Sequence, residues 1–199
     1  MTAARAIAEE DLADGRRQRT VRSRRQIVDA MLALVGEGEM HPSAAQVAAR
    51  ANVGLRSVFR HFEDMDSLYR EMSARLEAEI LPLATAPFEA KDWRGRLREL
   101  LQRRAGIFER LLPYRVAGAV RRFQSAYLME DYRRTLAFEQ AALRTVLPKT
   151  ILADAPLLAA LELAVGFESW RVLRQDYGLN RRKAEDVVRT SVEGLIKGL

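Results

Sequence analysis

The chain has 199 residues, of which 48% are hydrophobic, and it contains no cysteine. This length and composition suit one or two globular domains, and they exclude an intrinsically disordered chain, disulfides and thiolate metal sites. The net charge of +6 at pH 7 favours a polyanionic partner.

Helical patterns run along most of the chain. No segment alternates hydrophobic and polar residues with a period of two, so the fold class is predicted to be all-α. Residues 1–19 lack a regular hydrophobic period and are predicted to form a flexible, arginine-containing N-terminal tail. A first helix is predicted over residues 20–35, and Gly36 and Gly38 should end it.

The next segment predicts two short helices joined by a tight turn. Ser43 is suited to cap a second helix, and Asn52 tolerates the left-handed conformation that a tight turn requires. A third helix is predicted over residues 55–62. This arrangement is the helix-turn-helix, whose second short helix enters the DNA major groove. Residues 20–66 are therefore predicted to be a DNA-binding domain.

The third helix has two contrasting faces. Val58 and Phe62 stand one turn apart and should pack inward. Nine arginines and only three acids lie within residues 16–62, which favours DNA binding over an ordinary solvated surface. The opposite face of the helix collects hydrogen-bond donors, namely Arg56, Ser57, Arg60 and His61.

Six arginines also lie within residues 16–25, at positions 16, 17, 19, 22, 24 and 25. Two interpretations carry equal weight. These side chains could follow the DNA backbone or enter a narrow minor groove, or they could simply make the tail soluble.

Further helices are predicted beyond the head. Asp64 or Asp66 should cap a fourth helix over residues 66–80, and the most apolar later stretch, residues 157–172, is interrupted by two glutamates. We therefore expect no membrane span and a protein that stays in the cytoplasm. The remaining helices are predicted near 92–112, 114–124, 126–147, 155–176 and 181–197.

The last two of these helices carry more hydrophobic residues than one buried face requires, which predicts a homodimer built from two helices of each subunit. Such a dimer would present two recognition helices to a palindromic operator. The hydrophobic positions are Leu157, Leu158, Leu161, Leu163, Val165 and Phe167 on the first, and Val188, Val192, Leu195 and Leu199 on the second.

Residues 24–72 resemble the TetR (tetracycline repressor) family of transcriptional regulators. The resemblance rests on Ile27, Ala30 and Leu34, then on the segments 47–51 (Val-Ala-Ala-Arg-Ala) and 58–62 (Val-Phe-Arg-His-Phe). It implies an N-terminal helix-turn-helix domain and a ligand-binding and dimerisation domain over residues 67–199. The implied function is a ligand-responsive repressor that binds a double-stranded DNA operator as a homodimer.

The same resemblance implies which residues meet DNA. Arg56 is the expected base reader, and Leu55 could either touch a thymine methyl or pack in the core. Four positions depart from the common family pattern: Asn52, Gly54, Phe59 and Met65. The predicted interface is Ser43, Leu55, Arg56, Ser57, Phe59, Arg60 and His61.

The resemblance also implies an apolar pocket for a small-molecule effector of unidentified class in the middle helices. Aromatic side chains at helical spacing are more often part of an ordinary core. Arg121 and Arg122 could pair with an anionic effector, although surface solvation is the simpler interpretation. The candidate lining residues are Phe108, Phe123, Tyr127, Phe138 and Trp170.

The sequence also bears on two other classes of function. The chain has only two histidines, His41 and His61, and no glycine-rich phosphate loop, metal-spaced pair or nucleophile motif, so we expect neither an enzyme nor a cofactor. The alternative that stays open is a helical dimeric adaptor that binds a partner protein without recognising a DNA sequence.

Overall fold

The computed structural model describes the backbone of residues 2–198 and the side chains of residues 17–198. This part of the chain is all-α, as predicted, and contains no strand. One short segment, η1, is a π-helix. The elements are α1 (Thr2–Gly36), α2 (Ala44–Arg50), α3 (Leu55–His61), α4 (Met65–Ala84), α5 (Trp93–Arg121), α6 (Ala126–Arg144), α7 (Lys149–Ala153), α8 (Ala155–Ala164), α9 (Phe167–Arg171), η1 (Val172–Asp176) and α10 (Arg181–Leu195).

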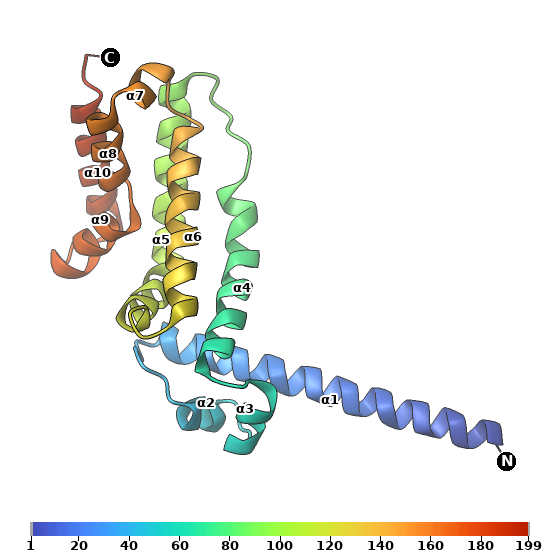
Figure 1. The fold of residues 1–199 in the computed structure, drawn as a ribbon. Helices are drawn as coiled ribbons and strands as arrows, with labels where there is room; N and C mark the ends of the chain where they lie inside the picture. Colours follow the sequence, from blue (N-terminus) through green and yellow to red (C-terminus); the bar gives the residue numbers. More distant parts are fainter. Residues whose placement is uncertain (1, 199) are drawn as a thin grey trace.

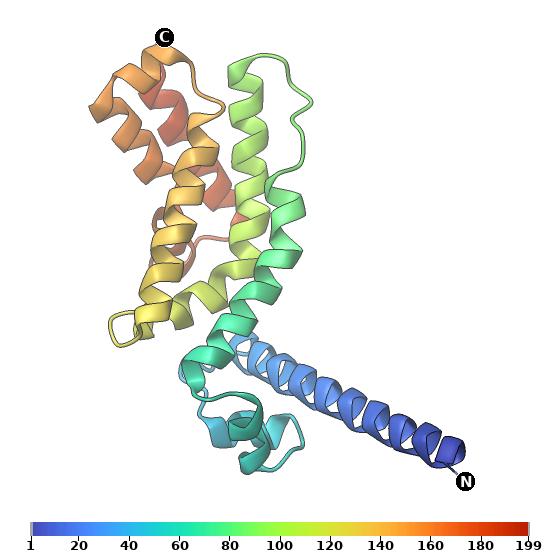
Figure 2. The ribbon, with the colours of Figure 1, turned by 45° about the vertical axis from the view of Figure 1, so that its right-hand side comes forward.

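The helices form a small head and a larger body (Figure 1). The head consists of α2, α3 and the C-terminal half of α1, and the N-terminal half of α1 projects beyond the rest of the molecule. Helix α4 runs from the head into the body, where it lies beside α5 and α6 (Figure 2). The head is therefore joined to the body through the start of α4.

The sequence explains the local structure of the head. Ser43 caps α2 in a reciprocal capping box with Gln46, as the serine at this position predicted. Asn52 has a φ of 53°, which confirms the predicted left-handed turn between α2 and α3. Asp64 caps α4, and its carboxylate accepts a hydrogen bond from the Ser67 amide at 2.7 Å.

The head has its own hydrophobic core, to which α1, α2, α3 and the start of α4 all contribute. Polar contacts hold the same helices together. Arg24 of α1 donates to the carbonyl of His61 at 2.6 Å and forms an ion pair with Glu71 of α4. Its guanidinium also lies 4.5 Å from the ring centre of Phe62. The core contains Ile27, Met31, Val35, Val47, Val58, Phe62, Leu68, Tyr69 and Met72.

The start of the first helix differs from the prediction. Helix α1 begins at Thr2, whereas residues 1–19 were expected to form a flexible tail. This segment contains several alanines, which have the highest helix propensity, and Gly15 is the one strong helix-weakening residue within it. The prediction relied on hydrophobic periodicity, which a helix projecting from the core does not need. Met1 lies outside the described residues.

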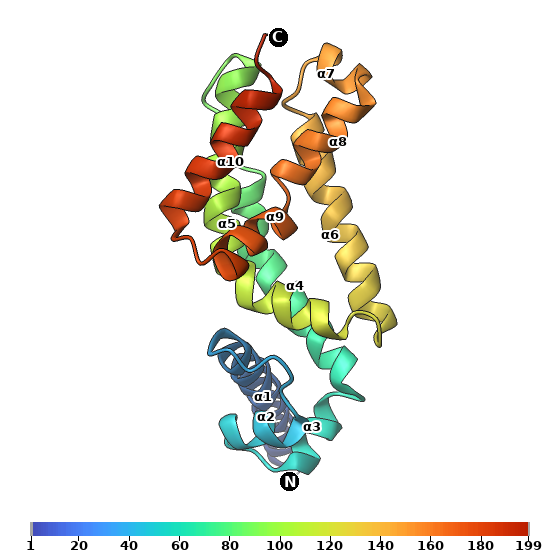
Figure 3. The ribbon, with the colours of Figure 1, turned by 90° about the vertical axis from the view of Figure 1, so that its left-hand side faces the viewer.

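Helix α5 also differs from its prediction, because it continues through Pro113 instead of ending there. Proline removes one backbone hydrogen bond from a helix and commonly bends it. The last part of α5 turns across the body near the head (Figure 3). This bend lets Tyr114 and Ala117 pack against the core of the head.

The predicted helix over residues 155–176 is divided into α8, α9 and η1. Gly166 caps α9, and a Cβ at this glycine would lie 3.0 Å from the carbonyl oxygen of Glu162. Hydrophobic periodicity does not reveal such a close approach. Asn180 caps α10, and its side chain accepts a hydrogen bond from the Lys183 amide at 2.9 Å. None of the helices in the described part of the chain is both long and apolar enough for a membrane span.

Candidate DNA interface and ligand cavity

The outer face of α3 presents two arginines and two large hydrophobic side chains to solvent. Leu55 is 45% exposed and Phe59 is 53% exposed, and Arg56 and Arg60 are also exposed. The sequence left the position of Leu55 open between the core and the groove, and the structure places it on the surface. Val58, one turn from the core residue Phe62, is buried as predicted.

Three other predicted interface residues are more constrained. The Ser43 hydroxyl donates to Gln46 at 2.8 Å and belongs to the α2 cap, although Ser43 itself is exposed. Ser57 is half-buried. His61 does not offer Nε2 to DNA, because this nitrogen is buried and has no hydrogen-bond partner among the described groups. Burial lowers the pKa of His61, and the nearby positive charges of Arg60 and Arg24 lower it further, so the ring is neutral at pH 7.

The arginines of α1 do not all have the same role. Arg17 is exposed on the projecting half of α1, and Arg22 and Arg25 are exposed on the half that belongs to the head. Arg24 instead holds the head together through its contacts to α3 and α4. The side chain of Arg16 lies outside the described residues.

A cavity of about 230 Å³ lies between α4, α5 and α6, with the start of α9 on one side. Its wall is mainly hydrophobic and includes Met72, Leu76 and Ile80 from successive turns of α4. A smaller pocket of about 80 Å³ adjoins it and shares part of its lining, including Ile80 and Phe138. The polar side chains on the wall of the larger cavity include Tyr69, Ser73, Glu77, Arg115, Arg122, Asp131, Arg134 and Glu168.

The five aromatic residues predicted to share a cavity do not do so. Phe138 lines both pockets, and Phe108 lines only the smaller one. Phe123 is 76% exposed in the loop between α5 and α6, and Tyr127 packs against the core of the head. Trp170 is buried in a separate cluster with Phe108. Periodicity shows that a helix has a buried face, but it does not show which part of that face borders a cavity.

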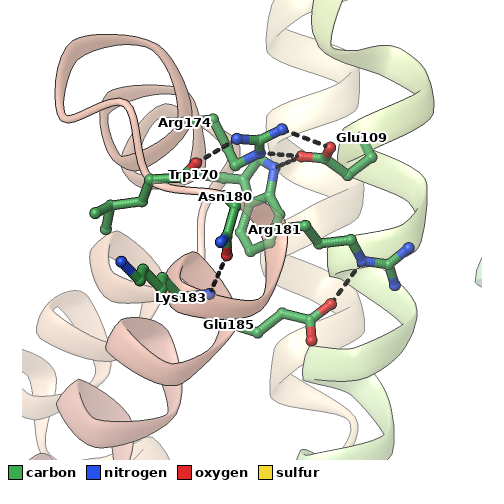
Figure 4. Close-up of polar contacts among 8 residues, drawn as sticks. Glu109, Trp170, Arg174, Asn180, Arg181, Lys183 and Glu185 are labelled. Carbon is green, nitrogen blue, oxygen red and sulfur yellow. Dashed lines mark hydrogen bonds and ion pairs between the residues drawn. The ribbon is translucent and has the colours of Figure 1, made fainter.

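A polar network holds Trp170, which lines neither pocket, against α5 (Figure 4). Glu109 of α5 accepts a hydrogen bond from Trp170 Nε1 at 2.9 Å and another from Arg174 Nε at 2.6 Å. Arg174 also donates to the carbonyl of Leu179. The network ties α5 to α9 and η1. The hydrogen bond from Arg174 is the largest cause of a lowered pKa at Glu109.

Helices α8 and α10 lie side by side along one edge of the body (Figure 3). Most of the hydrophobic side chains that predicted a dimer are taken up by the core of the subunit itself, including Leu161, Val165 and Val192. Leu163 of α8 is 70% exposed, and Val187 of α10 is also exposed. Leu199 lies outside the described residues.

Comparisons with known proteins rest on structure alone, because no family model and no curated protein matches the chain. A transcriptional regulator from Rhodococcus sp. Rha1 is similar, with a TM-score of 0.67 and 20% identity over 88% of this chain and 96% of that chain. A protein from Mesorhizobium loti described as a TetR-family transcriptional regulator has a TM-score of 0.62 and 21% identity over 89% and 96% of the two chains. The chain has the TetR fold.

A third structure with the TetR fold is the multidrug binding protein EbrR in complex with imidazole, with a TM-score of 0.59 and 19% identity over 84% of this chain and 88% of that chain. The resemblance drawn from residues 24–72 is therefore confirmed at the level of the fold. The structure also extends it, because the similarity covers the TetR-type body as well as the head.

Proposed function

We propose that this protein is a TetR-like, ligand-responsive transcriptional repressor and not an enzyme. The observation that carries the proposal is the exposed face of α3, where Arg56 and Arg60 flank Leu55 and Phe59 on the second helix of a helix-turn-helix. Arginine reads guanine edges with two hydrogen bonds, and an apolar side chain suits the thymine methyl group. Both kinds of side chain lie on α3, the helix that enters the major groove in a helix-turn-helix.

The proposed regulator acts as a homodimer on a palindromic operator. The exposed Leu163 and Val187 on α8 and α10 support this, because large hydrophobic side chains on adjacent helices are typical of a surface that a second copy covers. A dimer with a two-fold axis would present two α3 helices to successive turns of the duplex. We propose residues 20–66 as the DNA-binding domain and 67–199 as the ligand-binding and dimerisation domain.

The proposed effector site is the cavity between α4, α5 and α6. EbrR, a protein of the same fold, is named as a multidrug binding protein, which supports a small-molecule ligand here too. The effector would favour one of two orientations of the head and so change the affinity for the operator. Helix α4 is suited to this coupling, because it both lines the cavity and enters the core of the head.

Fluorescence anisotropy with the intergenic DNA upstream of the gene tests the proposal. We expect the wild-type protein to bind one palindromic site specifically. Arg56→Gln should lose about 1–3 kcal/mol of binding free energy at one base pair of each half-site. Arg110→Gln, which removes the same charge from an exposed position on α5, should leave specific binding unchanged. Equal affinity for the intergenic DNA and for random duplexes would instead favour the adaptor.

A further inference from the structure

We propose that the cavity binds a small apolar carboxylate and that Arg122 holds the carboxylate group. The inference deepens the proposed function, since it names the chemical class of the effector, and it rests on that proposal for the cavity being the effector site. The cavity is hydrophobic over most of its wall, but one cation on that wall, Arg122, has two buried nitrogens without a hydrogen-bond acceptor among the described groups.

Arg122 follows the last turn of α5, and its side chain is only 20% exposed. Its guanidinium is placed between two aromatic rings, 4.1 Å from the ring centre of Tyr132 and 5.0 Å from that of Phe123. Nitrogens Nε and Nη1 are buried, and neither has a hydrogen-bond acceptor among the described groups. Buried donors without an acceptor are uncommon and cost stability, so this position suits an acceptor supplied by a ligand.

The other two cations on the cavity wall already have carboxylate partners. Arg115 donates to Glu139, and both side chains are largely buried. Arg134 forms ion pairs with Asp131 at 2.6 Å and with Glu77 at 3.2 Å. These charges are compensated within the protein, so neither arginine calls for an anionic ligand.

The acid nearest to Arg122 is Glu168, whose Oε1 lies 3.9 Å from Nη1. This separation is too long for a hydrogen bond. Glu168 is also exposed and accepts a hydrogen bond from Arg171 at 3.2 Å. Glu168 therefore lowers the net charge around Arg122 but accepts no hydrogen bond from the buried nitrogens of Arg122.

Tyr69 supplies a second donor on the same cavity wall. Its side chain is fully buried, and its hydroxyl has no hydrogen-bond partner among the described groups. Burial raises the pKa of Tyr69, so the phenol keeps its proton at neutral pH and can donate it to an anion. Two unused donors on residues that line one hydrophobic cavity favour an acceptor with several lone pairs, and a carboxylate meets this requirement once the side chains that cover these buried atoms move aside. An ammonium group would instead place one positive charge near another.

The volume limits the size of the ligand. An engineered protein cavity of about 150 Å³ holds benzene, which has six non-hydrogen atoms. Scaled by volume, a cavity of about 230 Å³ accommodates about nine or ten such atoms. Benzoate and phenylacetate have this size, and each combines a carboxylate with a ring that can lie against Met72, Leu76 and Phe138.

Isothermal titration calorimetry with the full-length protein tests the inference. The probes are benzoate and phenylacetate, their uncharged amides, and benzylamine as the cation. We expect both acids to bind about 10- to 100-fold more tightly than the amides, and benzylamine not to bind. Arg122→Gln should abolish the preference for acids while leaving the affinity for amides unchanged. The matched control Arg133→Gln, at an exposed arginine of α6 outside the cavity lining, should keep the preference.

Tyr69→Phe provides a second test if the Arg122 variant does not fold. It removes only the unpaired hydroxyl and should lower acid affinity several-fold without lowering the melting temperature. Equal affinity for acids and amides, a preference for benzylamine, or no binding of either acid at millimolar concentration would overturn the inference. So would an acid preference that survives Arg122→Gln. Operator binding without acid binding overturns only this inference, whereas acid binding without operator binding overturns only the proposed function.

Discussion

Ser125 connects the body to the head, and replacing it with alanine should destabilise the protein. Its side chain is 4% exposed and caps α6, where its hydroxyl accepts a hydrogen bond from the Leu128 amide at 3.1 Å. The same hydroxyl donates to a carboxylate oxygen of Asp66 in the first turn of α4 at 2.7 Å. The Ser125 side chain therefore caps α6 in the body and also hydrogen-bonds Asp66 in α4, the helix that connects the head to the body.

The size of the effect follows from these two contacts. Removing a helix N-cap costs about 1 kcal/mol, and losing a hydrogen bond to a charged group costs about 1.5–3 kcal/mol. Ser125→Ala should therefore lower the free energy of unfolding by about 2–4 kcal/mol. For a chain of this length, that corresponds to a fall in Tm of roughly 5–15 °C.

Urea unfolding followed by circular dichroism measures this change. Ser191→Ala is the matched control, since its hydroxyl is exposed on α10 and bonds only within its own helix at 2.9 Å. The control should change the free energy of unfolding by less than about 0.5 kcal/mol. A double-mutant cycle with Asp66→Ala should give a coupling energy of about 1–2 kcal/mol between the two side chains. A Ser125→Ala effect as small as the control, or additive effects in the cycle, would refute the reasoning.

Three further predictions concern other parts of the molecule. Glu109→Gln should lower the free energy of unfolding by about 1–3 kcal/mol at pH 7. The folded-state pKa of Glu109 is lowered, so its stabilising contribution is present above the unfolded-state pKa and disappears as the pH falls through the folded-state pKa. Urea titrations near pH 3 should therefore show a smaller difference in unfolding free energy between wild type and variant. Asn52→Ala should destabilise the head by about 1 kcal/mol, because alanine tolerates the φ of 53° less well than asparagine, and a neutral effect in urea unfolding would contradict this. Leu163→Glu should convert the proposed dimer to a monomer in sedimentation velocity, and an unchanged sedimentation coefficient would count against α8 as the dimer surface.

The head could be predicted from the sequence because its structure depends on local signals. A serine before a helix, an asparagine in a tight turn and two hydrophobic residues one turn apart each have a short-range physical meaning. The structure confirms these signals at Ser43, Asn52 and the pair Val58 and Phe62. Leu55 could not be placed in this way, because its exposure depends on how α3 lies against α1 and α4.

The resemblance implied a pocket in the middle helices, but its lining could not be predicted, because the wall combines partial faces of three helices and the start of a fourth. Aromatic residues were poor indicators, since Trp170 and Tyr127 fill other parts of the core. A better signal was the stripe formed by Met72, Leu76 and Ile80 on α4, three hydrophobic side chains one turn apart. Hydrophobic side chains one turn apart predict a helix face that packs against the protein, but they do not show whether the space beside that face is filled.

The same packing makes the cavity and the head energetically dependent on each other. Tyr69 and Met72 belong to the core of the head and also line the cavity, and Tyr114 of α5 and Leu128 of α6 do the same. Protein interiors are close-packed, so a ligand that displaces one of these side chains must change its contacts on the side of the head as well. A ligand that fits the cavity without moving them would instead favour the orientation of the head seen here. For the proposed regulator, whether an effector weakens or strengthens operator binding therefore depends on how its size compares with the space beside Tyr69 and Met72.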